Sequence, residues 1–197
     1  MTVRRSPHLI LASGSPRRRE LLVEAGYEFE VIPPTVPEVS EQWLTIREAT
    51  VWNALRKATE VARAKPDAVV LGADTLVILD GLMIGKPADY ADAARILKRL
   101  SGRVHEVWTA VYIYHFATGR AHHFQEMSQV RFRRLTDEAI TDYFGKVNPL
   151  DKAGAYAAQG HGTEIIERIE GSYTNVVGLP MEETTKVLGA FGIKALR

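Results

Sequence analysis

The stretch from Ala68 to Leu79 is almost entirely apolar, and Asp74 stands in the middle of it. So many aliphatic and β-branched residues predict a buried strand. The Asp80-Gly81 pair that follows is a strong hairpin signal, with Leu82 to Ile84 as the returning strand. Burying a carboxylate without a partner costs several kcal/mol, so Asp74 is expected at a sheet end or facing a cleft. There it could accept a proton from water or hold Mg²⁺. The structural alternative is a turn aspartate that caps local backbone.

Residue patterns predict further elements on both sides of this strand. Apolar runs bounded by turn residues predict strands at 9–12, 104–114, 122–133 and 164–169. Amphipathic patterns with capping residues predict helices at 16–26, 44–64, 89–100, 136–147 and 180–191. Strands and helices mixed with hairpins predict an α/β fold around a mixed sheet.

Length and composition narrow the class of protein. The chain has 197 residues, which fits one domain or one pair of closely packed lobes. It contains no cysteine, which excludes disulfides and thiolate metal sites. A net charge of +1 predicts binding neither to nucleic acid nor to membranes. Without a signal-peptide core or a spanning apolar segment, the expectation is a soluble, cytoplasmic protein.

A cluster of hydroxyl and guanidinium groups follows the first predicted strand. Ser13 and Ser15 flank a glycine, Ser15 is expected to cap the next helix, and Arg17 to Arg19 lie in its first turn. A positive side chain at this end of a helix is repelled by the helix dipole, which costs roughly 0.3–1 kcal/mol of stability for each charge. A bound phosphate would reverse that cost, so the segment is a candidate phosphate cradle. A capped surface helix with its arginines in solvent explains the motif equally well.

Other polar residues gain interest only if folding brings them near Asp74. Lys57, Lys86 and Lys152 would each be solvated when taken alone. Glu38, in a proline-flanked loop, is a possible second carboxylate for a metal. Gln159 lies in a glycine-rich segment, and its amide could read the edge of a nucleobase. A flexible glycine loop explains that segment equally well.

Blocks spread from Leu9 to about Leu188 resemble, in the same order, the Maf family of nucleotide pyrophosphatases. The blocks are LASGSPRRRELL at 11–22, GADT at 72–75, GKP at 85–87, LSG at 100–102, PLDKAGAY at 149–156, QG at 159–160, GSY at 171–173 and VGLP at 177–180. One such block would be a weak signal. This many in register form a specific resemblance.

The resemblance implies a two-lobed α/β fold related to inosine triphosphate pyrophosphatases, with a single domain over 1–197 and the substrate cleft between the lobes. It implies hydrolysis between the α and β phosphates of a nucleoside triphosphate, with Mg²⁺ or Mn²⁺. Asp74 matches the family's proton acceptor, and Glu38 with Asp74 the metal partners. The residues implied for phosphate binding are Ser13, Ser15, Arg18, Lys57, Lys86 and Lys152.

Three positions indicate the branch of the family. Arg17, Thr75 and Gln159 resemble the branch that acts on dTTP and UTP. The branch that acts on 7-methylguanosine triphosphate typically has Trp, Gln and Glu there. Two departures are visible: Pro37-Glu38 stands where an acidic pair is usual, and Trp52 where an arginine is usual.

The resulting hypothesis is a metal-dependent hydrolase. The metal, held by Asp74 or Glu38 and the triphosphate, would neutralise charge on the leaving pyrophosphate. Arg17, Arg18 and the lysines 57 and 86 would share that charge, and Asp74 would orient or deprotonate the attacking water. Three alternatives stay open: a nucleotide-binding regulator of cell division with little catalysis, a hydrolase of phosphosugars or cofactor phosphates, and a 7-methylguanosine triphosphate pyrophosphatase. The expected partner is the nucleotide alone, and the sequence leaves a homodimer open.

Overall fold

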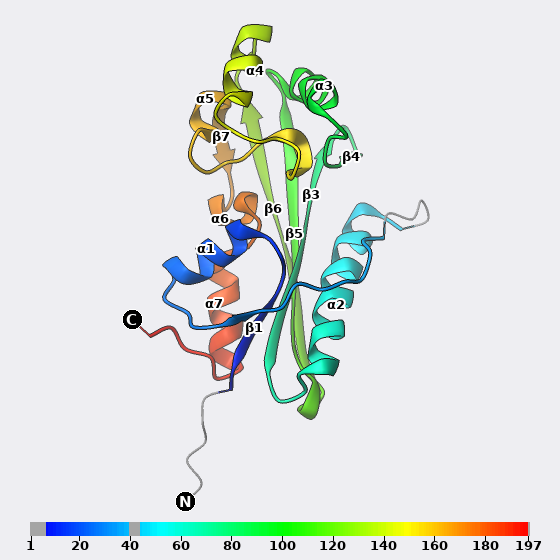
Figure 1. Ribbon diagram of the computed structural model, residues 1–197, viewed down its shortest axis with the longest axis vertical. Helices are drawn as coiled ribbons and strands as arrows, with labels where there is room; N and C mark the ends of the chain where they lie inside the picture. Colours follow the sequence, from blue (N-terminus) through cyan, green and yellow to red (C-terminus); the bar gives the residue numbers. More distant parts are fainter. Residues whose placement is uncertain (1–6, 40–43, 197) are drawn as a thin grey trace, which may run out of the picture. The chain divides into compact units, whose positions relative to one another are not determined.

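The computed structural model describes residues 7–39 and 44–196 (Figure 1). Its strands are β1 (Leu9–Ala12), β2 (Glu30–Val31), β3 (Val69–Leu79), β4 (Leu82–Ile84), β5 (Val104–His115), β6 (Arg120–Phe132) and β7 (Ile166–Glu170). Its α-helices are α1 (Pro16–Glu24), α2 (Ile46–Ala64), α3 (Tyr90–Leu100), α4 (Asp137–Phe144), α5 (Gly162–Ile165), α6 (Tyr173–Val177) and α7 (Met181–Ala190). Two short 3₁₀ turns are η1 (Phe116–Thr118) and η2 (Ala153–Ala155).

The strands form one mixed sheet in the order β2-β1-β3-β5-β6-β7, with β4 paired to β3. β1 runs parallel to both β2 and β3, whereas the β3–β4 and β6–β7 pairs are antiparallel. The predicted α/β class around a mixed sheet is therefore confirmed.

The chain divides into two compact units. Unit 1 comprises residues 1–74, 109–125 and 178–197, and unit 2 comprises residues 75–108 and 126–177. The strands β3, β5 and β6 contribute residues to both units. Each unit has its own buried core.

Unit 1 is built around the parallel strands β1 and β3. Side chains alternate along a strand, so Ile10 of β1 points to the α2 face, where it packs with Ala58 and Val61. Leu9 and Leu11 point to the opposite face and are also buried. In the ribbon, α2 lies on one side of the strands and α1 and α7 lie on the other (Figure 1). Layers on both faces explain why β1 is apolar throughout.

Unit 2 begins with the β3–β4 hairpin. Asp80 and Gly81 both have positive φ, 53° and 75°, which is the backbone that a two-residue primed turn requires. The hairpin pairs Val77 with Ile84 and Leu79 with Leu82. Buried side chains of α3 and α4 complete the core with β5, β6, η2 and β7, among them Leu97, Leu100, Val107, Phe132, Ile140, Tyr143, Tyr156 and Ile166.

Several sequence expectations need correction. The strand expected at 164–169 covers Ile166–Glu170 instead, because the residues 162–165 form the helical turn α5. The helix expected at 136–147 ends at Phe144. Asp74 does not lie at a sheet end, since β3 continues for several residues beyond it. The short elements β2 and α6 were not predicted. No helix within the described residues has the length and apolar character needed to span a bilayer.

Candidate functional site

Gly72 allows helix α2 to approach strand β3 very closely. A Cβ atom at this position would lie 2.7 Å from the backbone oxygen of Ala54 and 2.7 Å from the backbone nitrogen of Ala58. Only glycine fits such an approach without moving the helix. Lys57 and Asn53 are neighbours of these two alanines, and both reach Asp74, two residues beyond Gly72 on β3.

Lys57 joins two carboxylates. Its ammonium nitrogen lies 2.7 Å from Oδ1 of Asp74 and 2.6 Å from Oε1 of Glu38. The side chains of Lys57 and Asp74 are 11% and 4% exposed, whereas that of Glu38 is 55% exposed. The buried carboxylate is therefore paired, and the second carboxylate beside it stays accessible to solvent.

The pKa of Asp74 reflects two opposing influences. Burial raises the pKa of this carboxyl, and the charge and hydrogen bond of Lys57 oppose that rise. The charge of Glu38 adds to the rise, and that of Arg18 opposes it. A carboxylate with a raised pKa is a better proton acceptor than one in water, provided that it is ionised.

A loop that carries Glu38 is fastened along α2. Glu60 accepts hydrogen bonds from the backbone of Thr35 and Val36, and Arg56 donates to the carbonyl of Pro37. Asn53 accepts the N–H of Val39 at 2.8 Å and donates to its carbonyl at 3.1 Å. These α2 residues are spaced by three or four positions, so they share one face of the helix. That face holds the loop and fixes where Glu38 meets Lys57.

Arg18 crosslinks three segments of unit 1. Its guanidinium donates to Oγ of Ser13 at 3.1 Å, to the carbonyl of Ala73 at 2.9 Å and to the carbonyl of Gly178 at 2.8 Å. The residue is 8% exposed, and burial lowers the pKa of the guanidinium, while the nearby Asp74 opposes that shift. Arg18 thus does not point into solvent, and its guanidinium interacts with both Ser13 and the charge of Asp74.

The turn between β1 and α1 differs from expectation in one detail. Ser15 occupies the N-cap position before Pro16, as predicted. Among the described residues, however, its hydroxyl makes no capping hydrogen bond. Its backbone N–H donates instead to Oγ of Ser13, at 3.2 Å. Ser13 therefore receives bonds both from this turn and from Arg18.

A family model described as Maf-like protein matches residues 8–191. This chain belongs to the Maf family. The predicted resemblance is thereby confirmed over nearly the whole chain.

Curated relatives of this Maf protein match it almost end to end. A dTTP/UTP pyrophosphatase of Bdellovibrio bacteriovorus is 46% identical over 190 residues, which cover 94% of this chain and 99% of that one. A dTTP/UTP pyrophosphatase of Vibrio parahaemolyticus is 42% identical over 190 residues, covering 96% and 100%.

Among solved structures, two similar ones are HAM1 proteins. The protein from Coxiella burnetii aligns with a TM-score of 0.44 and 18% identity, over 66% of this chain and 74% of that one. The Ham1 protein of Staphylococcus aureus aligns with a TM-score of 0.44 and 16% identity, over 64% and 71%.

The remaining predicted site residues of the Maf protein lie on other elements. Arg17 is half-buried on α1 of unit 1. Thr75, Lys86, Lys152 and Gln159 belong to unit 2, where Lys86 is exposed and the other three are half-buried. The structure thus brings Ser13, Arg18, Glu38, Lys57 and Asp74 together within unit 1. The relation of the unit 2 residues to Asp74 stays a prediction.

Within unit 2, two of the family blocks meet. The N–H of Gly154 donates to the carbonyl of Gly85 at 3.1 Å, which joins the segment of Lys86 to that of Lys152. The ammonium of Lys152 bonds the carbonyl of Asn148 at 2.8 Å and also pairs with Asp151. The two predicted phosphate lysines therefore belong to adjoining segments.

The carboxylates of unit 1 suit a hard divalent cation. Mg²⁺ in proteins is commonly held by one or two carboxylates together with substrate phosphates and water. Glu38 and Asp74 converge on one ammonium group, so their oxygens already surround a single positive charge. Among the described residues no group of three or more His, Cys, Asp and Glu is assembled as a metal site. The protein's donor set therefore fits a cation that is shared with a phosphate ligand.

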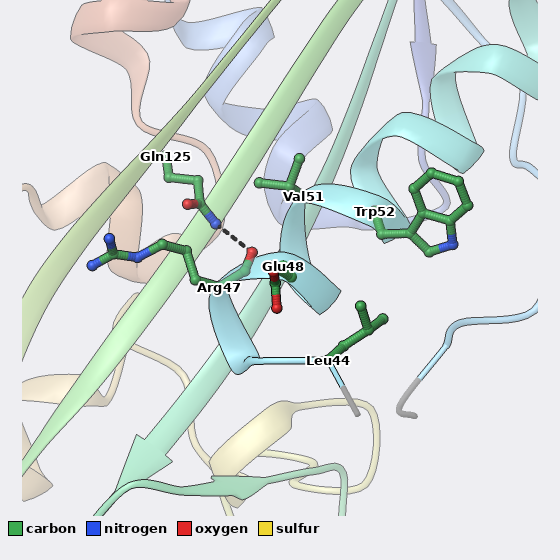
Figure 2. A pocket seen from close by; sticks show the side chains of 6 residues that line it. All are labelled: Leu44, Arg47, Glu48, Val51, Trp52 and Gln125. Carbon is green, nitrogen blue, oxygen red and sulfur yellow. Dashed lines mark hydrogen bonds between the residues drawn. The ribbon is translucent and has the colours of Figure 1, made fainter. Parts of the chain in front are cut away.

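A separate pocket of about 550 Å³ lies at the start of α2 (Figure 2). Its lining residues are Leu44, Arg47, Glu48, Val51, Trp52 and Gln125. The side-chain amide of Gln125 donates to the carbonyl of Arg47 at 2.9 Å, which ties β6 to the helix. Trp52, which stands where the family usually has an arginine, is 48% exposed and lines this pocket.

Asn53 is the member of the cluster that sequence reasoning missed. It is 3% exposed, and its amide nitrogen lies 3.3 Å from Oδ2 of Asp74. One available signal was its position four residues before Lys57, which places both side chains on the same helix face. The alanines on this face predict burial, and a buried amide must find partners.

Proposed function

We propose that this chain is a nucleoside triphosphate pyrophosphatase that acts on dTTP and UTP. The observation that carries the proposal is the buried Asp74, paired with Lys57 beside the second carboxylate of Glu38. Membership of the Maf family supports the activity. The names of relatives 42–46% identical over almost the whole chain support the two substrates.

The reaction is a hydrolysis at the α phosphorus. An oxygen of water forms the new P–O bond, the bond to the bridging oxygen breaks, and pyrophosphate leaves with that oxygen. Asp74 accepts a proton from the attacking water, for which its buried position and raised pKa are suited. The products are the nucleoside monophosphate and pyrophosphate.

The cations of the site meet the charge of the triphosphate. Lys57 lies beside Asp74, and Arg18 holds the Ser13 turn just before α1, where the N-terminus of a helix favours an anion. We assign phosphate binding to these residues together with Ser15, Lys86 and Lys152. A divalent cation at Glu38 and Asp74 would supply further charge neutralisation on the phosphates. Phosphoryl transfer depends on such positioning and electrostatics more than on a protein nucleophile.

Selection of the base is assigned to Arg17, Thr75 and Gln159. The proposal for these three residues rests on the family resemblance of their positions in the sequence. A cytoplasmic location, where free nucleotides are found, belongs to the same proposal.

The test is a side-by-side assay of purified protein with dTTP, UTP, CTP, dATP, GTP and 7-methylguanosine triphosphate. Each reaction contains Mg²⁺ or Mn²⁺, with a matched EDTA reaction. Pyrophosphate and nucleoside monophosphate are measured together, because their equal release locates the cleavage between the α and β phosphates. We expect turnover of dTTP and UTP that requires the metal.

Other outcomes of this assay point to other functions. Faster hydrolysis of 7-methylguanosine triphosphate would move the chain to the other branch of the family. Release of inorganic phosphate in place of pyrophosphate would exclude the proposed bond. Tight binding of dTTP without turnover would indicate a nucleotide-binding regulator.

A further inference from the structure

Asn53 touches both parts of the candidate site. Its amide nitrogen lies 3.3 Å from Oδ2 of Asp74 and 3.1 Å from the carbonyl of Val39, and its amide oxygen accepts the Val39 N–H at 2.8 Å. The residue is 3% exposed, so these bonds are made away from water. An amide NH₂ group has two donors, and here both are used.

The two contacts constrain different carboxylates. Lys57 holds Oδ1 of Asp74, so the bond from Asn53 to Oδ2 fixes the rotation of the carboxylate plane. Val39 directly follows Glu38, so the bonds to its backbone limit where the Glu38 side chain begins. One rigid side chain thus sets the distance between two groups that approach the same ammonium.

Loop anchoring alone does not account for this arrangement. The loop is also held by Glu60 at Thr35 and Val36, and by Arg56 at Pro37. Of the described α2 residues that hold this loop, Asn53 and Lys57 are the two that also bond to Asp74. Lys57 is a charged group with a flexible stem, whereas Asn53 is short and planar, which suits it to fixing geometry.

We propose that Asn53 is a positioning residue of the pyrophosphatase site, which sets the Asp74 carboxylate against the Glu38 loop. The inference rests on the proposed function. Its consequence is that removing the Asn53 amide slows the chemical step while leaving most nucleotide binding intact. Removing a residue that orients a catalytic side chain without touching the substrate typically lowers activity by about 10–100-fold.

The test compares Asn53→Leu with the control Arg56→Met. Leucine has a similar size but cannot donate or accept, so it releases both Asp74 and Val39. Arg56→Met removes another tether of the same loop, at the carbonyl of Pro37, and leaves Asp74 untouched. For Asn53→Leu we expect kcat on UTP to fall about 10-fold or more, with KM within about threefold. For Arg56→Met we expect kcat within about twofold of the wild type.

A second variant separates positioning from loss of folding. Asn53→Asp keeps the size of the side chain and can still accept the N–H of Val39, but it has no NH₂ group to donate to both Asp74 and the carbonyl of Val39. When ionised it repels Asp74, and when protonated it can donate to only one of these two acceptors. Rates are expressed per folded protein, measured by near-UV circular dichroism. We expect this variant also to lose kcat by about 10-fold or more, with the same metal requirement.

The outcomes distinguish the two proposals. If the wild type releases pyrophosphate from UTP and either Asn53 variant retains its kcat, the positioning role is wrong and the proposed function stands. An equal loss of kcat in Arg56→Met would show that loop anchoring is sufficient, and would also overturn the role. A wild type without pyrophosphate release overturns both proposals.

Discussion

The carboxylate of Asp74 forms an ion pair with Lys57, so catalysis should depend on its negative charge and not only on its shape. In Asp74→Asn the amide oxygen can still accept from Lys57, and Lys57 keeps its contact with Glu38. We therefore expect the variant to fold. Since the amide cannot accept a proton from water, kcat on dTTP should fall by about 10²–10⁴-fold. Circular dichroism and pyrophosphate release measure the two effects, and turnover like that of the wild type would refute the role of Asp74 as base.

Arg18 is expected to matter for stability as well as for phosphate binding. A lysine has one nitrogen in place of a planar fork, so it cannot serve Ser13, Ala73 and Gly178 together. We expect Arg18→Lys to lower the free energy of unfolding by about 2–4 kcal/mol, because buried carbonyls lose their donor. The neighbouring Arg19 is exposed, and Arg19→Lys should change the stability by less than about 0.5 kcal/mol. Urea denaturation compares the two, and equal stabilities would contradict the structural role of Arg18.

At the scale of elements, the close contact of α2 with β3 depends on Gly72. A methyl group there would lie within 2.7 Å of two backbone atoms of α2, so the helix must move away. We expect Gly72→Ala to cost about 1–3 kcal/mol of stability through overpacking. It should also lower kcat, since α2 carries Lys57 and Asn53 to Asp74.

Gly189 of α7 provides the matched control for this substitution. Nothing lies within 4 Å of a Cβ atom built there, and the residue is inside a helix. Gly189→Ala should therefore stabilise the protein by about 0.5–1 kcal/mol through helix propensity, with unchanged kcat. Denaturant titration and the UTP assay are applied to both variants. A neutral Gly72→Ala would mean that α2 can shift without consequence.

Elements with a strong local pattern could be predicted from the sequence. The β3–β4 hairpin follows from its Asp80-Gly81 turn, and α2 was expected at 44–64, close to the observed Ile46–Ala64. By contrast, β2 has only two residues, and its backbone pairs with β1, which lies about 20 residues earlier in the sequence. The helical turn α5 has four residues, too few to show a helical pattern of apolar side chains. The sequence of α5 and β7 together therefore predicts a strand. Tertiary pairing, not local propensity, decides such short segments.

The site shows the same division between local and tertiary information. The family blocks identify Ser13, Arg18 and Asp74, but they do not indicate that Asp74 lies inside a strand. Asn53 belongs to none of these blocks. Its importance emerges only when α2 packs on Gly72 and its amide meets both Asp74 and the loop. The spacing of residues shows that Asn53 shares a helix face with Lys57, but the contact with Asp74 depends on the folded backbone.

At the scale of the whole molecule, stability in acid should depend on one histidine far along the chain from Asp74. His105 is 2% exposed in the core of unit 2, and its Nε2 lies 2.8 Å from the hydroxyl of Tyr156. Nδ1 has no hydrogen-bond partner among the described residues. Burial lowers the pKa of His105 from 6.5 to about 4. The folded protein therefore keeps this ring neutral where the unfolded chain would protonate it.

The sign of the pH dependence follows from that difference. Between pH 6.5 and about 4 the unfolded chain binds the proton and the folded protein does not, so acid favours unfolding. The free energy of unfolding should thus be greatest above pH 6.5 and fall by up to about 3 kcal/mol as the pH approaches 4. In His105→Gln the side chain stays neutral throughout, so this part of the slope should disappear even if the variant is less stable at pH 8. Urea denaturation at several pH values between 8 and 4 measures both slopes, and an identical slope in the variant would show that His105 is not the group that acid titrates.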